Sequence, residues 1–215
     1  MRTGAVGRVV VPVLVLLALT ACTSTSTRTR DAREQSPATS AAPSPVPVPP
    51  ARRASSVVRP QRPMALVLPS GVVVPVRGAS TNRTGLLDVP ADPGIAGWWT
   101  GGSRVGDPFG STLVAAHVDS RPQGLGPFAE LLELAGGERL RLDSAGLTQD
   151  FEVRSLRLVP QGPLTERSGL FAPSGPRRLT LVTCAPPYVA SRGGYQNLAV
   201  VTAVPVSAPT RVVAR

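Results

Sequence analysis

Two side chains in this 215-residue chain are suited to nucleophilic attack on a carbonyl group. Cys184 ends the run Thr-Leu-Val-Thr-Cys at 180–184, and His117, the only histidine, follows the apolar run at 113–116. A thiol attacks as thiolate and an imidazole titrates near neutrality, so the pair has the two functions that acyl transfer through a thioester requires. The sequence identifies this pair, and the fold must bring the two side chains together.

Several other kinds of chemistry are disfavoured by composition. All 23 basic residues are arginine, which excludes a lysine nucleophile or Schiff base. A zinc site needs three or four protein ligands, whereas the region beyond the N-terminal segment offers one histidine and one cysteine, so we expect no metal and no cofactor. Aromatic residues make up only 4% of the chain, which argues against a nucleic-acid stacking surface.

The elements that would position the pair are short strands. Runs rich in Val, Leu and Ile alternate with clusters of Gly, Pro, Asn and Asp, a pattern typical of an all-β barrel or sandwich. The segment 127–134 departs from it, because it begins with proline and has apolar residues at helical spacing, and it predicts one short helix. The expected strands are 65–68, 72–76, 112–118, 138–142, 151–159, 178–184 and 198–206.

The strand that carries Cys184 has two distinct faces, because alternate side chains point to opposite sides. Positions 180, 182 and 184 share one face, and positions 179, 181 and 183 share the other. Pro186 and Pro187 follow, and we expect pairing of the strand to stop there. Cys184 would then lie at the end of a rigid strand, where a side chain can reach a surface groove.

The N-terminus resembles a bacterial lipoprotein leader. Arg2 and Arg8 precede an 11-residue apolar run at 9–19, shorter than the ~20 residues of a membrane-spanning helix. Leu-Thr-Ala-Cys at 19–22 resembles a lipobox, with Cys22 as the lipidated residue. The alternatives are an ordinary leader or a short uncleaved anchor in which Cys22 is incidental. A disulfide between Cys22 and Cys184 is disfavoured, because a cysteine at the leader junction would have to fold back across a flexible tether.

The segment after Cys22 is rich in Pro, Ser, Thr and Arg, and we interpret it as a tether. Residues 28–62 hold seven arginines against Asp31 and Glu34, so much of the net charge of +10 lies in a segment that should not fold. Such a tether favours contact with anionic envelope polymers or lipid headgroups over nucleic acid. The expected organisation is a signal peptide at 1–21, a tether at 22–63, a catalytic domain at 64–207 and a disordered tail at 208–215.

From about residue 66 to 206 the chain resembles the sortases, which are envelope cysteine transpeptidases, and more closely the actinobacterial group called class F. The resemblance rests on four stretches. They are Thr-Leu-Val-Thr-Cys at 180–184, Ala-His-Val-Asp-Ser at 116–120, the pair Leu-Asp-Val-Pro at 87–90 and Ala-Gly-Trp-Trp at 96–99, and Tyr-Gln-Asn-Leu-Ala-Val-Val at 195–201.

The resemblance implies a sortase-like eight-stranded β-barrel with one or two short helices, in which Cys184 and His117 face one another. Cys184 would attack the Thr carbonyl of an LPXTG-like sorting signal, and His117 would protonate the leaving amine. The acyl group would pass to an amine of the cell wall or to water. The partners are then a peptide or protein carrying the signal and, through the N-terminal lipid, the outer face of the cytoplasmic membrane, with no nucleic acid.

One departure from the family pattern concerns the arginine that would assist the oxyanion. Class F sortases carry it directly after a tyrosine before the final strand, whereas Gln196 follows Tyr195 here. Arg192, on a loop with two glycines, is the nearest substitute, and a solvated loop arginine is the alternative. Ala116 stands where family members usually have glycine. The remaining groove candidates are Thr183, Asp119, Gln196 and Asn197, and Asp119 could orient His117.

Other cysteine enzymes fit less well. The L,D-transpeptidases place the nucleophile after Ser-x-Gly, whereas Val-Thr precedes Cys184. Papain-like peptidases place cysteine before histidine in the chain, and His117 comes first here. The remaining alternative is an envelope lipoprotein with a sortase fold and impaired catalysis that binds a peptide or protein, which the missing arginine motivates.

Overall fold

The computed structural model describes residues 58–83, 86–161 and 170–212. The chain divides into two units, Met1–Ala51 and Arg52–Arg215, and all described residues belong to the second. The expected leader, Cys22 and most of the expected tether therefore lie outside the described residues. Within the described ranges, no helix is long and apolar enough to cross a bilayer.

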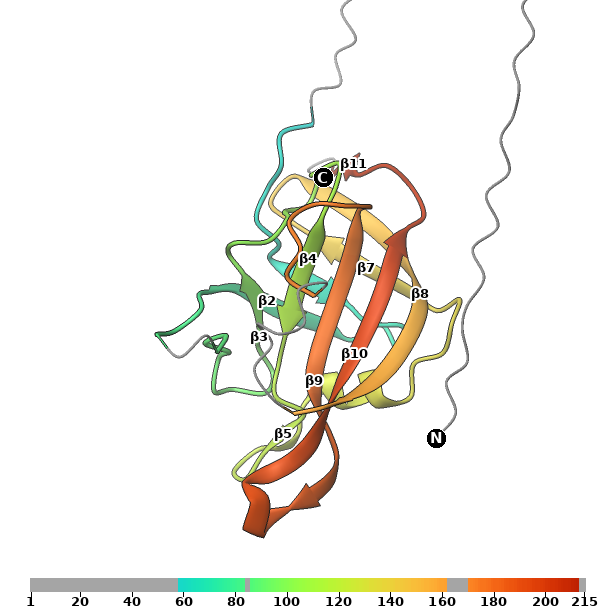
Figure 1. Ribbon diagram of the computed structural model, residues 1–215. Coiled ribbons are helices and arrows are strands. Elements are labelled where there is room, and N and C mark those ends of the chain that lie inside the picture. The colour runs from blue at the N-terminus through green and yellow to red at the C-terminus, as the bar shows by residue number, and fades with distance from the viewer. Residues whose placement is uncertain (1–57, 84–85, 162–169, 213–215) are drawn as a thin grey trace, which may run out of the picture. The chain divides into compact units, whose positions relative to one another are not determined.

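Eight strands close into a barrel, in the order β10-β9-β4-β3-β2-β1-β7-β8, because β8 pairs with β10 as well as with β7 (Figure 1). This confirms the predicted all-β barrel. The barrel strands are β1 (Ala65–Val67), β2 (Val73–Ala79), β3 (Ala96–Trp99), β4 (Ser111–Ala115), β7 (Arg139–Asp143), β8 (Leu147–Pro160), β9 (Arg178–Val189) and β10 (Gly194–Pro205). Outside the barrel lie β5 (Asp119–Ser120), β6 (Gly124–Leu125), β11 (Thr210–Arg211) and the 3₁₀ helices η1 (Pro127–Leu132) and η3 (Ala190–Arg192).

The strand that carries Cys184 lies between two strands of different direction. β9 runs parallel to β4 and antiparallel to β10, and it pairs with both along much of its length. Its interior face places Leu179 and Leu181, both 0% exposed, in the core of the barrel. The predicted alternation of faces is therefore confirmed along this strand, because Val182 and Cys184 belong to a second apolar cluster.

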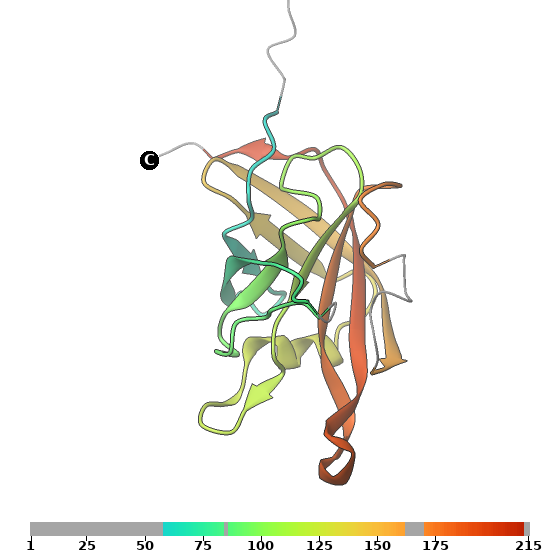
Figure 2. The ribbon, with the colours of Figure 1, turned by 60° about the vertical axis from the view of Figure 1, so that its left-hand side comes forward.

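This second cluster covers the outer face of β4, β9 and β10. Its buried members include Leu113, Val182 and Leu198, and side chains from two loops pack against them. Leu87 and Val89 come from the loop before β3, and Phe171 comes from the loop before β9. Figures 1 and 2 show that the β9–β10 hairpin extends below the barrel, at the end away from the entry of residues 58–62.

The prediction that β9 stops at Pro186-Pro187 was wrong. Pairing with β10 shifts register between Tyr195 and Asn197 and then resumes, with Tyr195 opposite Tyr188. The two prolines fall in this interruption, where the ladder makes no demand on a proline N–H. Cys184 therefore lies just before a bulged part of a long strand rather than at the strand's end.

Other boundaries differ from the expectations in simple ways. β4 ends at Ala115 instead of residue 118, so His117 lies in the loop that follows. The short helix over 127–132 is present in 3₁₀ form. β3 was not predicted, because its four residues include Gly97. Thr210 and Arg211, expected in a disordered tail, pair with β8 as β11, so that part of the expectation was also wrong.

Candidate active site

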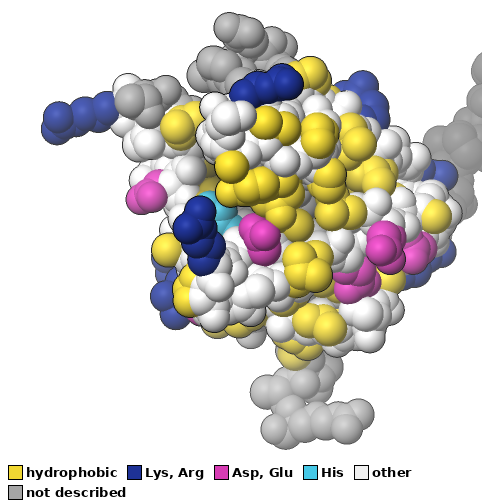
Figure 3. All heavy atoms as spheres, turned by 90° about the horizontal axis from the view of Figure 1, so that it is seen from below, with side chains coloured by type: hydrophobic (Ala, Val, Ile, Leu, Met, Phe, Trp, Pro, Cys, Tyr) yellow, Lys and Arg dark blue, Asp and Glu magenta, His cyan; other side chains and the backbone are white. Residues whose placement is uncertain are grey.

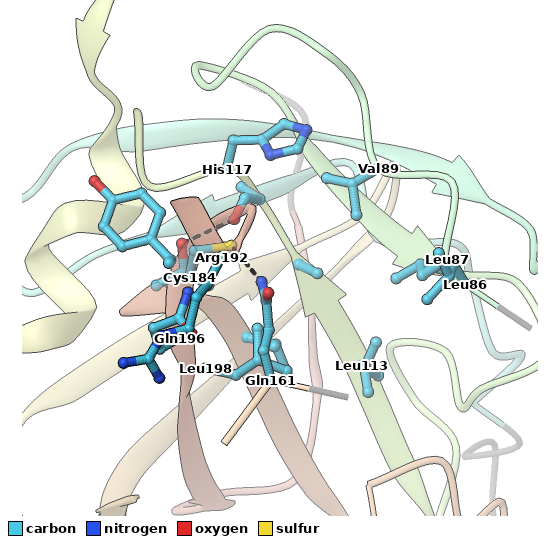
Figure 4. A pocket seen from close by; sticks show the side chains of 15 residues that line it. Leu86, Leu87, Val89, Leu113, His117, Gln161, Cys184, Arg192, Gln196 and Leu198 are labelled. Atoms are coloured by element: carbon cyan, nitrogen blue, oxygen red, sulfur yellow. Dashed lines mark hydrogen bonds between the residues drawn. The ribbon is translucent and has the colours of Figure 1, made fainter. Parts of the chain in front are cut away.

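A groove on the outer face of β4, β9 and β10 contains both chemically active side chains. It has a volume of about 690 Å³, and Cys184 and His117 both line it (Figure 4). Arg192, Gln196 and Thr183 are also among its lining residues. Most of the remaining lining is apolar: Leu86, Leu87, Val89, Leu113, Ala115, Ala116, Val182 and Leu198.

Two hydrogen bonds hold the histidine loop against the cysteine strand. The N–H of Ala116 donates to the carbonyl of Val182 (3.2 Å), and the hydroxyl of Thr183 donates to the carbonyl of Ala116 (2.9 Å). His117 directly follows Ala116, and Cys184 directly follows Thr183. The backbone therefore fixes the two functional residues on neighbouring segments, although neither takes part in the bonds.

Thr183 is thus a positioning residue rather than a side chain open to substrate. It is 2% exposed, and its hydroxyl is occupied by the carbonyl of Ala116. Ala116 itself is 4% exposed. Threonine is well suited to this position, because its β-branched side chain packs well in a strand and its hydroxyl can donate a hydrogen bond to the neighbouring segment.

The Cys184 thiol lies half-buried against the second apolar cluster. Burial raises its pKa above the ordinary value, and the negative charge of Asp119 raises it further. A hydrogen bond acts in the opposite direction, because the side-chain amide of Gln161 donates to Sγ at 3.6 Å and lowers the pKa (Figure 4). The resting thiol is therefore mostly protonated at neutral pH, and Gln161 already points an N–H at the reacting atom.

His117 is exposed, in the loop between β4 and β5. Among the described residues, its imidazole forms no hydrogen bond or ion pair. The expectation that Asp119 could orient it is not supported by this geometry: β4 ends before His117, so the two residues do not share a strand, and the carboxylate of Asp119 accepts a hydrogen bond from Tyr195 instead (2.8 Å).

A hydrogen bond joins Tyr195 of β10 to Asp119 of β5. Tyr195 comes from β10, lines the groove and packs edge-to-face on Tyr188 of β9, with ring centroids 5.1 Å apart. Asp119 begins β5, two residues after His117. The hydrogen bond to the carboxylate is the largest of several causes that raise the pKa of Tyr195 to about 12, so the phenol stays protonated as a donor over the physiological range.

The two candidates for the missing arginine are both present at the groove. Arg192 is exposed on η3 and is the only arginine among the described residues that line the groove. The side-chain amide of Gln196 donates to the carbonyl of Gly194 (2.7 Å) and is therefore already engaged. Asn197 also faces a local partner, because its amide donates to the carbonyl of Pro186 (2.6 Å) across the bulge.

Sequence reasoning missed Gln161 and the partnership of Tyr195. Gln161 directly follows β8, and its backbone N–H donates to the carbonyl of Gln196 (2.8 Å). Only the pairing of β8 with β10 brings it to Cys184, which is 23 positions away in the chain. No local pattern could have identified it. Tyr195 lay within a quoted motif, but its contact with Asp119 depends on the path of the loop after β4.

Figure 3 shows the molecule from the hairpin end. Hydrophobic side chains form a broad band, and the histidine lies at the side of this band among a few charged groups. Among the described residues, no group of three or more His, Cys, Asp or Glu side chains could hold a metal ion. The arrangement fits an apolar, extended ligand that presents a carbonyl group to the sulfur.

Comparison with known proteins agrees with this geometry. The family model of the sortase domain matches residues 70–206. Similar solved structures include sortase E1 of Streptomyces coelicolor with a tripeptide in its active site (19% identity, 70% of this chain and 91% of that chain, TM-score 0.51). Pilus Island 1 sortase C2 of Group B Streptococcus (22%, 70% and 76%, 0.52) and the SrtA sortase of Actinomyces oris (22%, 73% and 86%, 0.51) are also similar. No curated protein matches the sequence.

Proposed function

This chain belongs to the sortase family, and from that premise we propose that it is a cysteine transpeptidase that cleaves an LPXTG-like sorting signal through a thioester on Cys184. The observation that carries the proposal is the pair of bonds between Ala116, Val182 and Thr183, which holds the His117 loop beside the Cys184 strand at one groove. Membership of the family supports the reaction type, and the groove supplies the place.

In the proposed reaction, the sulfur of Cys184 attacks the carbonyl carbon of the scissile peptide bond. His117 takes the thiol proton and returns a proton to the leaving amine as the C–N bond breaks, which leaves the acyl group on sulfur. An amine or water then attacks the thioester, gives up a proton to His117, and the sulfur leaves. Because the pKa of Cys184 is raised, the thiol is protonated in the resting protein, and its proton must be transferred during the reaction.

Two groups at the groove can stabilise the oxyanion that forms during attack. The amide of Gln161 already donates to Sγ. When Sγ attacks a carbonyl carbon, a short movement would bring this N–H near the oxygen of that carbonyl group. Arg192 reaches from η3 with a guanidinium that has no partner among the described residues. We propose Arg192 as the main donor to the oxyanion or to the peptide backbone, and Gln161 as a second donor whose hydrogen bond also stabilises the thiolate.

The apolar lining supports recognition of a peptide with aliphatic residues before the scissile bond. Leu87 and Val89, which are half-buried, and Leu113 and Leu198, which are buried, all line the groove. A leucine side chain that is fully buried there gains about 1.5–3 kcal/mol of binding free energy. We propose an amine of the envelope or water as the acceptor.

The experiment is intact-mass analysis of the full chain mixed with LPXTG-like peptides. We expect an adduct whose mass equals the acyl fragment, located at Cys184 by peptide mapping, and lost when hydroxylamine is added. The Cys184→Ala variant should give neither adduct nor cleavage. Cleavage at an equal rate by that variant would end the enzymatic proposal.

A second function is favoured by one observation. The position directly after Tyr195 carries Gln196, whose amide is already engaged by Gly194, and not the arginine that the family pattern leads one to expect. A sortase-fold protein with impaired catalysis would then bind envelope peptides in the same groove. Saturable peptide binding by the unaltered chain, with no adduct and no cleavage, would select this function.

We also propose that the protein is of the class F type and is held at the outer face of the cytoplasmic membrane by a lipid on Cys22. The motifs at 180–184 and 116–120 and the lipobox-like sequence at 19–22 support these assignments. In a cell fractionation experiment, the unaltered protein should sediment with membranes and Cys22→Ser should be processed differently or released. An unchanged mass and location of Cys22→Ser would contradict lipidation.

A further inference from the structure

A second cavity, which shares no lining residue with the groove, is surrounded by arginines. It has a volume of about 870 Å³ and lies between residues 60–64, β2 and the turn between β7 and β8. Arg62, Arg77 and Arg104 line it, and no aspartate or glutamate does. We call this cavity the arginine cleft.

The three arginines carry uncompensated charge. All three are exposed, and among the described residues none of their side chains forms an ion pair or hydrogen bond. The contrast is on β7 and β8, where Arg139 and Arg154 both pair with Glu152 at 3.2 Å. Guanidinium groups without carboxylate partners that converge on one cavity are suited to a phosphate group, which they bind in a bidentate manner.

A fourth positive charge lies behind the loop that carries Arg104. Arg177 is 8% exposed, and its guanidinium donates to the carbonyl of Arg104 at 3.0 Å. Burial is the main cause that lowers its pKa, to about 10, so it remains charged at neutral pH. The carboxylate of Asp107, whose charge acts on Arg177 and raises its pKa, accepts a hydrogen bond from the backbone N–H of Arg104 (2.7 Å).

Two further observations indicate what kind of molecule would carry the phosphate group that the cleft binds. Met64, which also lines the cleft, is 57% exposed, so an apolar side chain stands beside the arginines. Pro60, which also lines the cleft, directly follows the arginine-rich segment 28–59 in the sequence. Arginines beside an exposed apolar group suit a membrane surface, where the apolar group enters the interface and the cations meet headgroups.

We propose that the arginine cleft binds the phosphate of an anionic phospholipid headgroup and so docks the domain on the membrane. Residues 58–62 enter at the end of the barrel away from the β9–β10 hairpin (Figure 2). Docking through the cleft turns that end toward the bilayer and leaves the hairpin end accessible from the envelope. This inference does not depend on catalysis, and it stands or falls independently of the proposed reaction.

The test is hydrogen exchange of the full chain reconstituted in vesicles. The reporters are the amides of Gln61 and Val105, which bond to each other's carbonyls at 2.9 Å beside Arg62 and Arg104. With phosphatidylglycerol present, we expect their exchange to be slower than in pure phosphatidylcholine vesicles, by about tenfold if nine-tenths of the molecules are docked. The slowing should weaken at high salt.

Two triple variants separate the cleft from general charge. Substituting Gln for Arg62, Arg77 and Arg104 should weaken docking by roughly a hundredfold and remove the slowing, because each arginine near an anionic surface contributes about fivefold. Substituting Gln for Arg139, Arg154 and Arg157 removes the same amount of charge from another part of the surface. This variant should keep the slowing of exchange. Exchange of the amides in β9 and β10 shows whether each variant is folded.

Three results would overturn the proposal. The first is equal exchange at Gln61 and Val105 in both kinds of vesicle. The second is slowing that survives loss of the cleft arginines or disappears in both triple variants alike. The third is equal slowing in phosphatidylcholine vesicles when inorganic phosphate is added at the same phosphate concentration, which would assign the cleft to a soluble phosphate instead of a lipid.

Discussion

The two faces of β9 serve different purposes within a single strand. Leu179 and Leu181 point into the barrel and are completely buried in its core. Val182 and Cys184 point outward into a smaller apolar cluster that loops cover only in part. The same backbone hydrogen bonds to β4 and β10 hold both sets of side chains. The interior face therefore stabilises the strand, and the outer face uses that rigidity to present a thiol.

This difference teaches that stability and reactivity can be altered separately here. A core side chain contributes through burial, so its loss is felt in the free energy of unfolding. The thiol is only half-buried and forms one long hydrogen bond, so its loss is felt mainly in chemistry. On β9, substitution of Leu181 should therefore lower stability, whereas substitution of Cys184, three positions away, should abolish the chemistry and leave stability nearly unchanged.

The largest expected effect is on turnover when the reacting groups are removed. Cys184→Ala and His117→Ala should each lower the rate of signal-peptide cleavage by at least about a thousandfold, because nucleophile and proton carrier are lost in turn. Thermal unfolding should change by no more than about 1 kcal/mol in either variant. A large loss of stability in His117→Ala would show that this exposed residue has a structural role, and the separation of the two faces would fail.

The second effect is on stability and involves the opposite face. Leu181→Ala should lower the free energy of unfolding by about 2–5 kcal/mol, since it removes a fully buried side chain from the barrel core. Val73→Ala, at a residue that is 59% exposed, should cost less than about 0.5 kcal/mol. Chemical denaturation measures both. If the folded fraction of Leu181→Ala cleaved peptide as poorly as Cys184→Ala, the two faces would be coupled.

The sequence was sufficient to predict the barrel and the alternation of faces on β9, because both follow from two-residue periodicity. The pairing of His117 with Cys184 was an expectation from the resemblance to the sortases, and the structure places both side chains along one groove. β9 could not be bounded correctly, because prolines usually end a strand. Here they occupy an interruption in pairing that depends on the partner strand β10.

The surroundings of the thiol could not be predicted for a similar reason. Gln161 reaches Cys184 only because β8 crosses from β7 to close the barrel against β10. The contact of Asp119 with Tyr195 depends on where the loop after β4 turns, and sequence reasoning assumed a longer strand. Contacts set by barrel closure and loop path carry no signature in a single sequence.

The third effect concerns the outer face and the rate. Arg192→Ala should lower turnover by about a hundredfold, because loss of an oxyanion donor costs about that much or more. Gln196→Ala should do less, since its amide is engaged by Gly194. Arg157→Ala, an exposed arginine of β8 outside the groove, is the charge-matched control. Steady-state rates in the reverse order would transfer the donor role to Gln196.

The smallest effects are on the titration of Cys184, and they test how its surroundings act on the thiol. Because burial raises its pKa, alkylation by iodoacetamide should be slow at neutral pH and should accelerate as pH rises through the alkaline range. Peptide-level mass spectrometry separates this reaction from that of Cys22. Two substitutions should change the rate at neutral pH in opposite directions.

Gln161→Leu removes a hydrogen bond that lowers the pKa, so alkylation at neutral pH should slow by about threefold for each half-unit of pKa, and the difference should vanish at high pH. Asp119→Asn removes a negative charge that raises the pKa, so alkylation should become faster. Gln123→Leu, an exposed glutamine outside the groove, should change nothing. If both Gln161→Leu and Asp119→Asn slowed alkylation, access to the groove rather than charge would control the thiol. The outer face of β9 would then be a packed surface, like the inner one.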